Sequence, residues 1–112
     1  MSGTGAQAEE QALAFLVRHG LQLKERNYRC RSGEIDLILL DGKTLVFVEV
    51  RMRRSRAFGG AAESITQRKR ARLVAAARHY LAGRQPIPAC RFDALLIESD
   101  ASPVWIKDAF GE

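Results

Sequence analysis

Three carboxylates and an arginine lie inside two apolar segments of this 112-residue chain, at positions where valine and leucine are the usual residues. Glu34 and Asp36 belong to the segment GEIDLILL, and Glu49 and Arg51 belong to the segment TLVFVEVR. Acids that lie side by side in apolar surroundings repel each other, and removing each from water is costly unless a partner compensates. The compensating partner is either an arginine in a structural network or a hard divalent cation such as Mg²⁺, which takes carboxylate oxygens and keeps several waters.

The parity of the two segments indicates whether these side chains can meet, because side chains on a strand alternate between the two faces of a sheet. A two-residue turn at Asp41-Gly42 places Asp36 opposite Phe47, whereas a four-residue loop places Asp36 opposite Glu49. Either loop gives a polar face with Glu34, Asp36, Glu49 and Arg51 and an apolar face with Ile35, Leu37, Val48 and Val50. A loop of odd length would separate Asp36 from Glu49.

The elements that position these residues follow from periodicity and from turn residues. The pattern predicts a helix over 6–19, strands over 21–31, 34–40 and 44–52, a second helix over 66–82, and strands over 90–98 and 104–107. Ser64 and Gln67 have the spacing of a capping box at the start of the second helix. This order predicts one α/β domain over 1–112, with a loose start at 1–5 and a central mixed sheet flanked by helices.

The first predicted helix carries a fourth acid. Its apolar stripe consists of Ala12, Leu13, Leu16 and Val17. Glu9 shares the packing face with this stripe, whereas Glu10 points about a third of a turn away. A glutamate at this place is either a metal ligand or a boundary residue that reaches water, and the residues alone favour the boundary residue.

The basic residues are concentrated in one part of the chain, whose net charge is +5 with a pI near 9.8. Between positions 51 and 72 a single acid, Glu63, stands against Arg51, Arg53, Arg54, Arg56, Arg68, Lys69, Arg70 and Arg72. Such a concentration favours polyanions, with nucleic acid as the candidate partner, although a solvated helix face and a loop would give the same composition.

Several segments together resemble the bacterial YraN family of predicted endonucleases, namely GEIDLI, FVEVR, RRSRAFGGAAESIT, RKRARLVAAARHYL and CRFDALLIE. That family is related to Holliday junction resolvases and belongs to the restriction-endonuclease-like PD-(D/E)XK nuclease superfamily. The resemblance runs from about position 9 to position 110. It implies a restriction-endonuclease-like fold and hydrolysis of phosphodiester bonds in DNA, including branched or junction DNA, with Mg²⁺ or Mn²⁺ as cofactor.

Carried over by position, the resemblance implies that Asp36 and Glu49 are catalytic metal ligands. The acid from the first helix falls best on Glu9, with Glu10 as a close alternative, and would complete the ligand set. Arg51 occupies the lysine place of the Glu-x-Lys element, where it would contact the phosphate or stabilise the transition state. Because a guanidinium stays protonated at any working pH, Arg51 is not expected to act as a base.

The concentration of positive charge predicts a nucleic-acid-binding set made of Arg53, Arg54, Arg56, Arg68, Lys69 and Arg72. Lys69 matches the family's recurring lysine and would substitute for the missing lysine if the second helix lies over the site. A second hypothesis is a non-catalytic nucleic-acid-binding module that retains the nuclease fold, in which arginines pair with the carboxylates. Relatives of the resolvase type suggest a homodimer.

The remaining features predict a protein of the cytoplasm without a membrane segment, because no run is long and apolar enough and the N-terminus lacks a secretory pattern. Cys30 and Cys90 are then expected to stay reduced. Asp93 is expected to pair with Arg91 in a structural role, and Trp105 to lie at a buried strand end rather than to form an exposed anchor.

Overall fold

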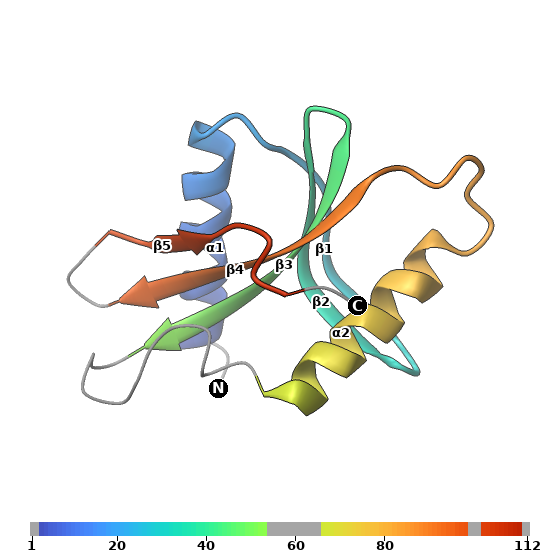
Figure 1. The fold of residues 1–112 in the computed structure, drawn as a ribbon. Coiled ribbons are helices and arrows are strands. Elements are labelled where there is room, and N and C mark those ends of the chain that lie inside the picture. The colour runs from blue at the N-terminus through green and yellow to red at the C-terminus, as the bar shows by residue number, and fades with distance from the viewer. Residues whose placement is uncertain (1–2, 54–65, 99–101, 111–112) are drawn as a thin grey trace.

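The computed structural model describes residues 3–53, 66–98 and 102–110, which contain two helices and five strands. Their order is α1 (Gly3–Arg18), β1 (Gln22–Cys30), β2 (Gly33–Asp41), β3 (Thr44–Arg53), α2 (Gln67–Leu81), β4 (Cys90–Glu98) and β5 (Val104–Ile106) (Figure 1). The predicted order of helices and strands is confirmed. The prediction of a loose start over 1–5 is wrong for 3–5, because α1 begins at Gly3. Residues 1–2 lie outside the described part.

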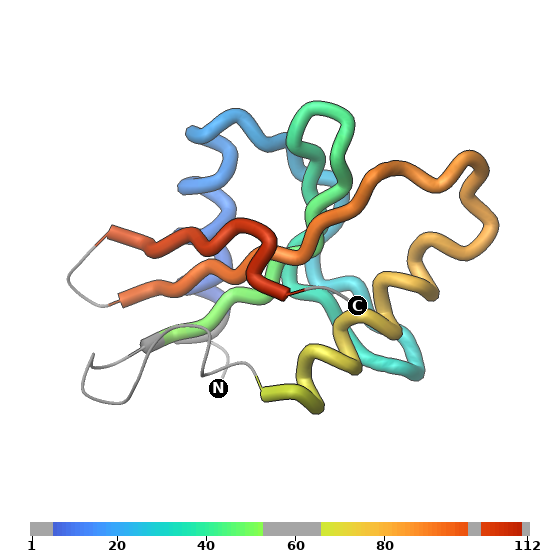
Figure 2. Tube along the Cα trace, viewed as in Figure 1, coloured from blue at the N-terminus to red at the C-terminus, as the bar shows by residue number. Residues whose placement is uncertain are grey.

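The strands form one sheet in the order β1-β2-β3-β4-β5. All neighbouring pairs are antiparallel except β3 and β4, which run parallel and are joined through α2. The trace in Figure 2 follows this crossover from the green end of β3 through the yellow helix to the orange β4. The sheet is therefore mixed and the architecture α/β, as predicted, and β1 is an edge strand. Neither described helix is long and apolar enough to cross a membrane.

The helices pack on different parts of the sheet and define two hydrophobic clusters (Figure 1). The α1 cluster joins Ala8, Ala12 and Leu16 to Leu37, Leu39, Val46, Val48, Leu95 and Ile97. The α2 cluster joins Leu73, Ala76 and Ala77 to Ile35, Ile38, Phe47, Phe92 and Phe110. The prediction that Val17 belongs to the buried stripe of α1 is wrong. Its side chain is 49% exposed, because the buried positions repeat every four residues from Ala8.

The hairpin between β2 and β3 turns one residue later than the two-residue alternative placed it. Asp41 pairs with Thr44, so that Gly42 and Lys43 form the turn, and Gly42 has φ +64° at its first position. Glycine is favoured there because a type II′ hairpin turn requires a positive φ at this residue. Leu37 pairs with Val48, and these residues are the direct neighbours of Asp36 and Glu49 in the two strands. The register therefore agrees with the alternative that places Asp36 opposite Glu49.

Strand β2 changes face at Asp36. Ile35 belongs to the α2 cluster, whereas Leu37 belongs to the α1 cluster, although strict alternation would put both on one side. On β1, Arg26 pairs with Leu37 and Tyr28 pairs with Ile35, and Asn27 between them has φ +53°. The prediction that Ile35 lines the same face as Leu37 is therefore wrong, because the alternation of β2 is interrupted at Asp36, level with the left-handed Asn27 of β1.

Helix α2 begins one residue later than predicted and has a different N-cap. The side chain of Thr66 accepts a hydrogen bond from the backbone N–H of Lys69 at 3.2 Å, which identifies Thr66 as the N-cap. Ser64, the residue assigned to the capping box, lies outside the described residues. The helix then passes close to the start of β2, because a Cβ added at Gly33 would lie 2.5 Å from the carbonyl oxygen of Arg72.

Candidate active site

Asp36 and Glu49 meet at the point where β2 and β3 separate. The β2–β3 ladder ends at the pair Leu37 and Val48, while β3 continues along β4 as far as Arg53. Oδ2 of Asp36 accepts a hydrogen bond from the backbone N–H of Val50 at 2.9 Å, so the side chain takes the place of a ladder partner. The carboxyl groups of Asp36 and Glu49 also lie close enough for each to affect the pKa of the other. The structure thus brings together the two acids that sequence parity had grouped.

Both acids are harder to ionise than in water. Burial is the main cause that raises the pKa of Asp36 to about 6, and the charges of Glu9 and Glu34 raise it further, whereas the Val50 hydrogen bond lowers it. Burial is also the main cause that raises the pKa of Glu49 to about 7, followed by the charge of Asp36. Two desolvated carboxyl groups that lie side by side keep their protons to a higher pH than in water unless a cation compensates their charges.

Arg51 lies beside Glu49 but pairs with it weakly. Nη1 of Arg51 is 3.7 Å from Oε2 of Glu49, which is longer than a hydrogen bond. Nε of Arg51 is buried and has no hydrogen-bond partner among the described residues. Although the charge of Arg51 lowers the pKa of Glu49, that pKa stays well above its ordinary value of 4.5. Arg51 therefore does not neutralise the acid pair by itself.

Helix α2 lies over the site and contributes two cations to it. Glu34, Glu49, Lys69, Arg72 and Leu73 line a cavity of about 190 Å³ between the strands and the first two turns of α2. The charge of Lys69 lowers the pKa of Glu49, and it has a larger effect than the charge of Arg51. On sequence alone, the role of Lys69 depends on whether the second helix lies over the site. In the structure, Lys69 of α2 lines the same cavity as Glu49.

The two acids of α1 have different surroundings. Glu10 is exposed and forms an ion pair with Arg26 of β1, with 2.9 Å between Oε2 and Nη2. Glu9 is half-buried, and its charge raises the pKa of Asp36, which places it near that carboxylate. Among the described residues, no three His, Cys, Asp or Glu side chains form a cluster that could hold a metal ion. The role of Glu9 as a third ligand therefore stays a prediction, and Asp36 and Glu49 are the acids that could share a cation.

The basic set predicted to bind nucleic acid is distributed over three places. Lys69 and Arg72 line the cavity, and Arg68 is exposed on the first turn of α2. Arg53 ends β3, where its backbone pairs with Glu98 of β4. Arg54 and Arg56 lie outside the described residues. A contact of this set with nucleic acid stays a prediction.

Asp93 belongs to a separate, structural network. Its buried carboxylate accepts hydrogen bonds from Arg91, from the indole N–H of Trp105 and from the backbone N–H of Asp108, at 2.9–3.0 Å. Arg91 also reaches Asp41 at 3.1 Å. These contacts hold β5 and the segment after it against β4, which confirms the structural role expected for Asp93. Cys30 and Cys90 are not joined by a disulfide.

Sequence reasoning missed how closely α2 approaches β2. Gly33 was not singled out, although its missing side chain lets the backbone of Arg72 come near. The glycine at the start of the acid-bearing strand was the sequence feature that could have indicated this close approach. No pattern in the sequence identifies its neighbour on α2.

Comparison with known proteins assigns the chain to a family without an assigned activity. Residues 8–97 match the model of the uncharacterised protein family UPF0102. A UPF0102 protein of Nitrosomonas eutropha is 56% identical over 108 residues, which cover 96% of this chain and 93% of that protein. A UPF0102 protein of Cupriavidus taiwanensis is 57% identical over 95% of this chain and 81% of its own length. One of Psychromonas ingrahamii is 49% identical, with 96% and 89% covered.

Proposed function

We propose that this chain, which belongs to the uncharacterised protein family UPF0102, is a Mg²⁺-dependent endonuclease that hydrolyses phosphodiester bonds in DNA. The observation that carries the proposal is the pair Asp36 and Glu49, two desolvated carboxyl groups that act on each other and have pKa values raised to about 6 and about 7. Groups whose pKa is perturbed by burial and by a like charge are concentrated at functional sites.

A purely structural network accounts poorly for this pair. In such a network the arginines would hold both acids in their ionised form through short, direct hydrogen bonds, as Arg91 holds Asp93 at 2.9 Å and 3.0 Å. Arg51 instead lies 3.7 Å from Glu49, and the pKa of Glu49 remains raised. A divalent cation is the compensating charge that best fits two neighbouring carboxylates of this kind.

The donor chemistry fits Mg²⁺ or Mn²⁺, with Asp36 and Glu49 as the residues that would hold the ion and Glu9 as the third candidate. Mg²⁺ uses one or two carboxylates and keeps several waters, so a complete cage of protein ligands is not required. When bound, such an ion lowers the pKa of a coordinated water and neutralises charge that develops on a phosphate.

The other residues of the site would act on the substrate. Lys69 and Arg72 line the same cavity as Glu49, where their charges would bind and orient a phosphate group. The backbone N–H of Val50 holds Oδ2 of Asp36 in place. Arg51, whose Nε has no hydrogen-bond partner among the described residues and whose Nη1 lies 3.7 Å from Glu49, would either contact the phosphate or stabilise the transition state. Because Arg51 stays protonated, it would not remove a proton from water.

The resemblance to the YraN family of predicted endonucleases supports the same proposal, together with a restriction-endonuclease-like fold. In the described structure, Glu49 of the acid-bearing hairpin lines one cavity together with Lys69 of α2, which supports this proposal. A junction with two-fold symmetry would suit a homodimer of this chain, which sedimentation in the presence of four-way DNA can detect.

The test is a cleavage assay with Mg²⁺ or Mn²⁺ on single-stranded, duplex, flapped and four-way DNA, with RNA strands of the same sequences. We expect cleavage of at least one DNA substrate that disappears in Asp36→Asn and in Glu49→Gln. Glu25→Gln is the matched control, because it makes the same chemical change at an exposed position on β1. No cleavage with either metal, or cleavage that survives both substitutions, would refute the proposal.

A second candidate function is a nucleic-acid-binding module without catalysis. It is favoured by the cations that already face Glu49, since Lys69 and Arg51 both lower the pKa of that acid. Such a module would bind DNA with an affinity that falls steeply with salt, because each phosphate contact releases counterions. Binding that responds to salt and to Arg72→Ala, but not to divalent metal or to Asp36→Asn, would support this function over the nuclease.

A further inference from the structure

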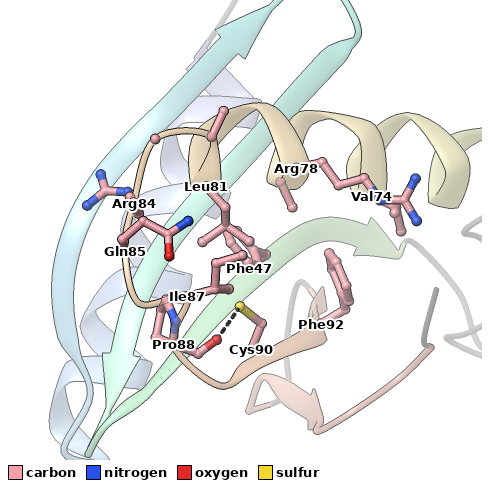
Figure 3. A pocket seen from close by; sticks show the side chains of 13 residues that line it. Phe47, Val74, Arg78, Leu81, Arg84, Gln85, Ile87, Pro88, Cys90 and Phe92 are labelled. Carbon is pink, nitrogen blue, oxygen red and sulfur yellow. Dashed lines mark hydrogen bonds between the residues drawn. The ribbon is translucent and has the colours of Figure 1, made fainter.

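A second concave surface lies at the C-terminal end of α2, and the site residues Glu49, Lys69 and Arg72 take no part in it. It has a volume of about 540 Å³ and lies between the last turns of α2, the segment after the helix, and strands β3 and β4 (Figure 3). We call it the α2 groove. Its lining consists of Phe47, Val74, Ala77, Arg78, Leu81, Ala82, Gly83, Arg84, Gln85, Ile87, Pro88, Cys90 and Phe92.

The lining of the α2 groove is mainly apolar. Phe47 and Phe92 are stacked at 5.5 Å and buried at its base, and Leu81 and Val74 form the helix wall. Ile87 stands on the opposite rim with 61% of its surface exposed, more than any other exposed large hydrophobic residue of the described chain. Ile87 therefore extends the apolar lining of the α2 groove to its exposed rim.

The α2 groove continues along the helix. A second hollow of about 570 Å³ shares Val74 and Arg78 with it and runs past Ala71 and Arg70 to Gln67 and Phe110. Together the two hollows follow α2 from its first turn to its end, and a helix of 15 residues is about 22 Å long. This length exceeds a single small ligand and suits an elongated occupant such as a peptide segment.

Positive charge frames the apolar lining. Figure 3 shows the guanidinium groups of Arg84 and Arg78 at opposite ends of the α2 groove. Arg84 is held there by a hydrogen bond from Nε to the carbonyl oxygen of Tyr80 and by its position 4.3 Å over the Tyr80 ring. No carboxylate is among the residues that line either hollow in the described chain. A complementary occupant therefore carries apolar side chains between acidic ones.

We propose that the α2 groove is a docking site for an acidic, amphipathic peptide segment of a partner protein. Its large apolar side chains would pack between Ile87 and Leu81, and its flanking Asp or Glu residues would meet Arg78 and Arg84. This inference goes beyond the proposed nuclease activity and does not depend on it, because it uses no residue of the acid pair or its cavity.

Nucleic acid fits the α2 groove less well than a peptide. Bases bind proteins by stacking on exposed aromatic faces. The phenylalanines at the base of the groove, Phe47 and Phe92, are 0% and 7% exposed, and the rim carries isoleucine and proline instead. A phosphate backbone would also find more cations at the first turn of α2, where Arg68, Lys69 and Arg72 lie close together.

The experiment is a selection of a displayed library of random 16-residue peptides on the wild-type protein, followed by binding assays with the enriched peptides. Ile87→Asp is the test variant, because it puts an acid on the exposed rim, and Arg84→Glu reverses one flanking charge. Val17→Asp is the matched control, since Val17 is an exposed aliphatic residue, 49% exposed, on α1. Circular dichroism checks that each variant is folded.

We expect enrichment of peptides in which Asp or Glu flank Leu, Ile, Phe or Trp, with affinity reduced tenfold or more in Ile87→Asp and in Arg84→Glu but not in Val17→Asp. A bound peptide should also slow alkylation of Cys90, which lines the groove, relative to Cys30. No enrichment, enrichment of neutral or basic peptides, or binding equal in wild type and Ile87→Asp would overturn the proposal. The proposal would also be overturned if Ile87→Asp abolished a dimer of the wild-type protein or its binding to single-stranded DNA.

Discussion

Replacing Asp36 with asparagine is expected to stabilise the protein at pH 8 in the absence of divalent metal. Such a gain is unusual for the loss of a charged residue that accepts a hydrogen bond from a backbone N–H. The reason is that the ionised pair, Asp36 and Glu49, is both desolvated and repulsive. Asparagine keeps the size of the side chain, and its amide oxygen can still accept the hydrogen bond from Val50.

The magnitude follows from the raised pKa of Asp36. A rise from 3.8 to about 6 corresponds to roughly 3 kcal/mol of folding free energy lost when the group is ionised. Because the folded state holds its proton more tightly than the unfolded state, stability falls as the pH rises from about 4 to about 6 for this group. The loss is absent below about pH 4 and complete at pH 8. Since part of the side chain still reaches water, we expect a gain of roughly 2–3 kcal/mol for Asp36→Asn at pH 8 and about half of it at pH 5.

The assay is guanidinium chloride unfolding of wild type, Asp36→Asn and Glu25→Gln at pH 5 and pH 8 in EDTA, with thermal unfolding in parallel. For a domain of this size, a gain of 2–3 kcal/mol corresponds to a rise in Tm of roughly 10 °C. Glu25→Gln removes an exposed carboxylate and should change the unfolding free energy by less than about 0.5 kcal/mol. Mg²⁺ at 100 times its Kd should stabilise wild type by about 2.7 kcal/mol at pH 8, and should stabilise Asp36→Asn much less.

The reasoning would be refuted if Asp36→Asn were less stable than wild type at pH 8. It would also be refuted if the two proteins differed in unfolding free energy by the same amount at pH 5 and pH 8. Either result would mean that the carboxylates are ionised and well compensated in the folded protein. The structural network of arginines would then be the better description, and the case for a metal would lose its electrostatic basis.

Three further substitutions test the surroundings of the pair. Lys69→Met should raise the pKa of Glu49 above about 7, because it removes a positive charge that lowers it, and NMR titration of the glutamate carboxyl carbons measures this shift. Gly33→Ala should cost roughly 1–3 kcal/mol in denaturant unfolding, because its Cβ would lie 2.5 Å from the carbonyl oxygen of Arg72 and force α2 away from the site; an unchanged midpoint would contradict the close approach. Asp93→Ala should cost roughly 3–5 kcal/mol in the same assay, since it removes the buried acceptor of the indole N–H of Trp105, of the backbone N–H of Asp108 and of Arg91, which keeps only Asp41. A loss below about 1 kcal/mol would speak against that network.

Short-range patterns in the sequence predict the elements of this protein well. The strand over 90–98 has the same bounds in the structure, and the hairpin arms differ by one residue at their ends. Side-chain parity also grouped Asp36 with Glu49, because an even loop preserves their common face whatever its length. These features depend only on neighbours along the chain, which is why one sequence sufficed.

Contacts between distant segments could not be predicted in the same way. Strict alternation placed Ile35 with Leu37, but the alternation of β2 is interrupted at Asp36, beside the left-handed Asn27 of the neighbouring strand. Similarly, the sequence could state what Lys69 would do over the site but not that α2 lies there. That placement depends on the approach of α2 to Gly33, a contact between residues about 40 positions apart.

The acid pair forms where strand β2 changes face, just beyond the end of the β2–β3 ladder. In a regular ladder, the backbone N–H of Val50 would pair with a carbonyl of β2, and the side chain of Asp36 would stand clear of both. Because β2 changes face here and the β2–β3 ladder has ended, Asp36 accepts the hydrogen bond from Val50 and its carboxylate comes beside Glu49. The same position brings Asp36 within the field of Glu9 on α1, while Glu49 faces Lys69 on α2. At the end of the β2–β3 ladder, acids of the sheet and charged groups of both helices are therefore close enough to act on one another.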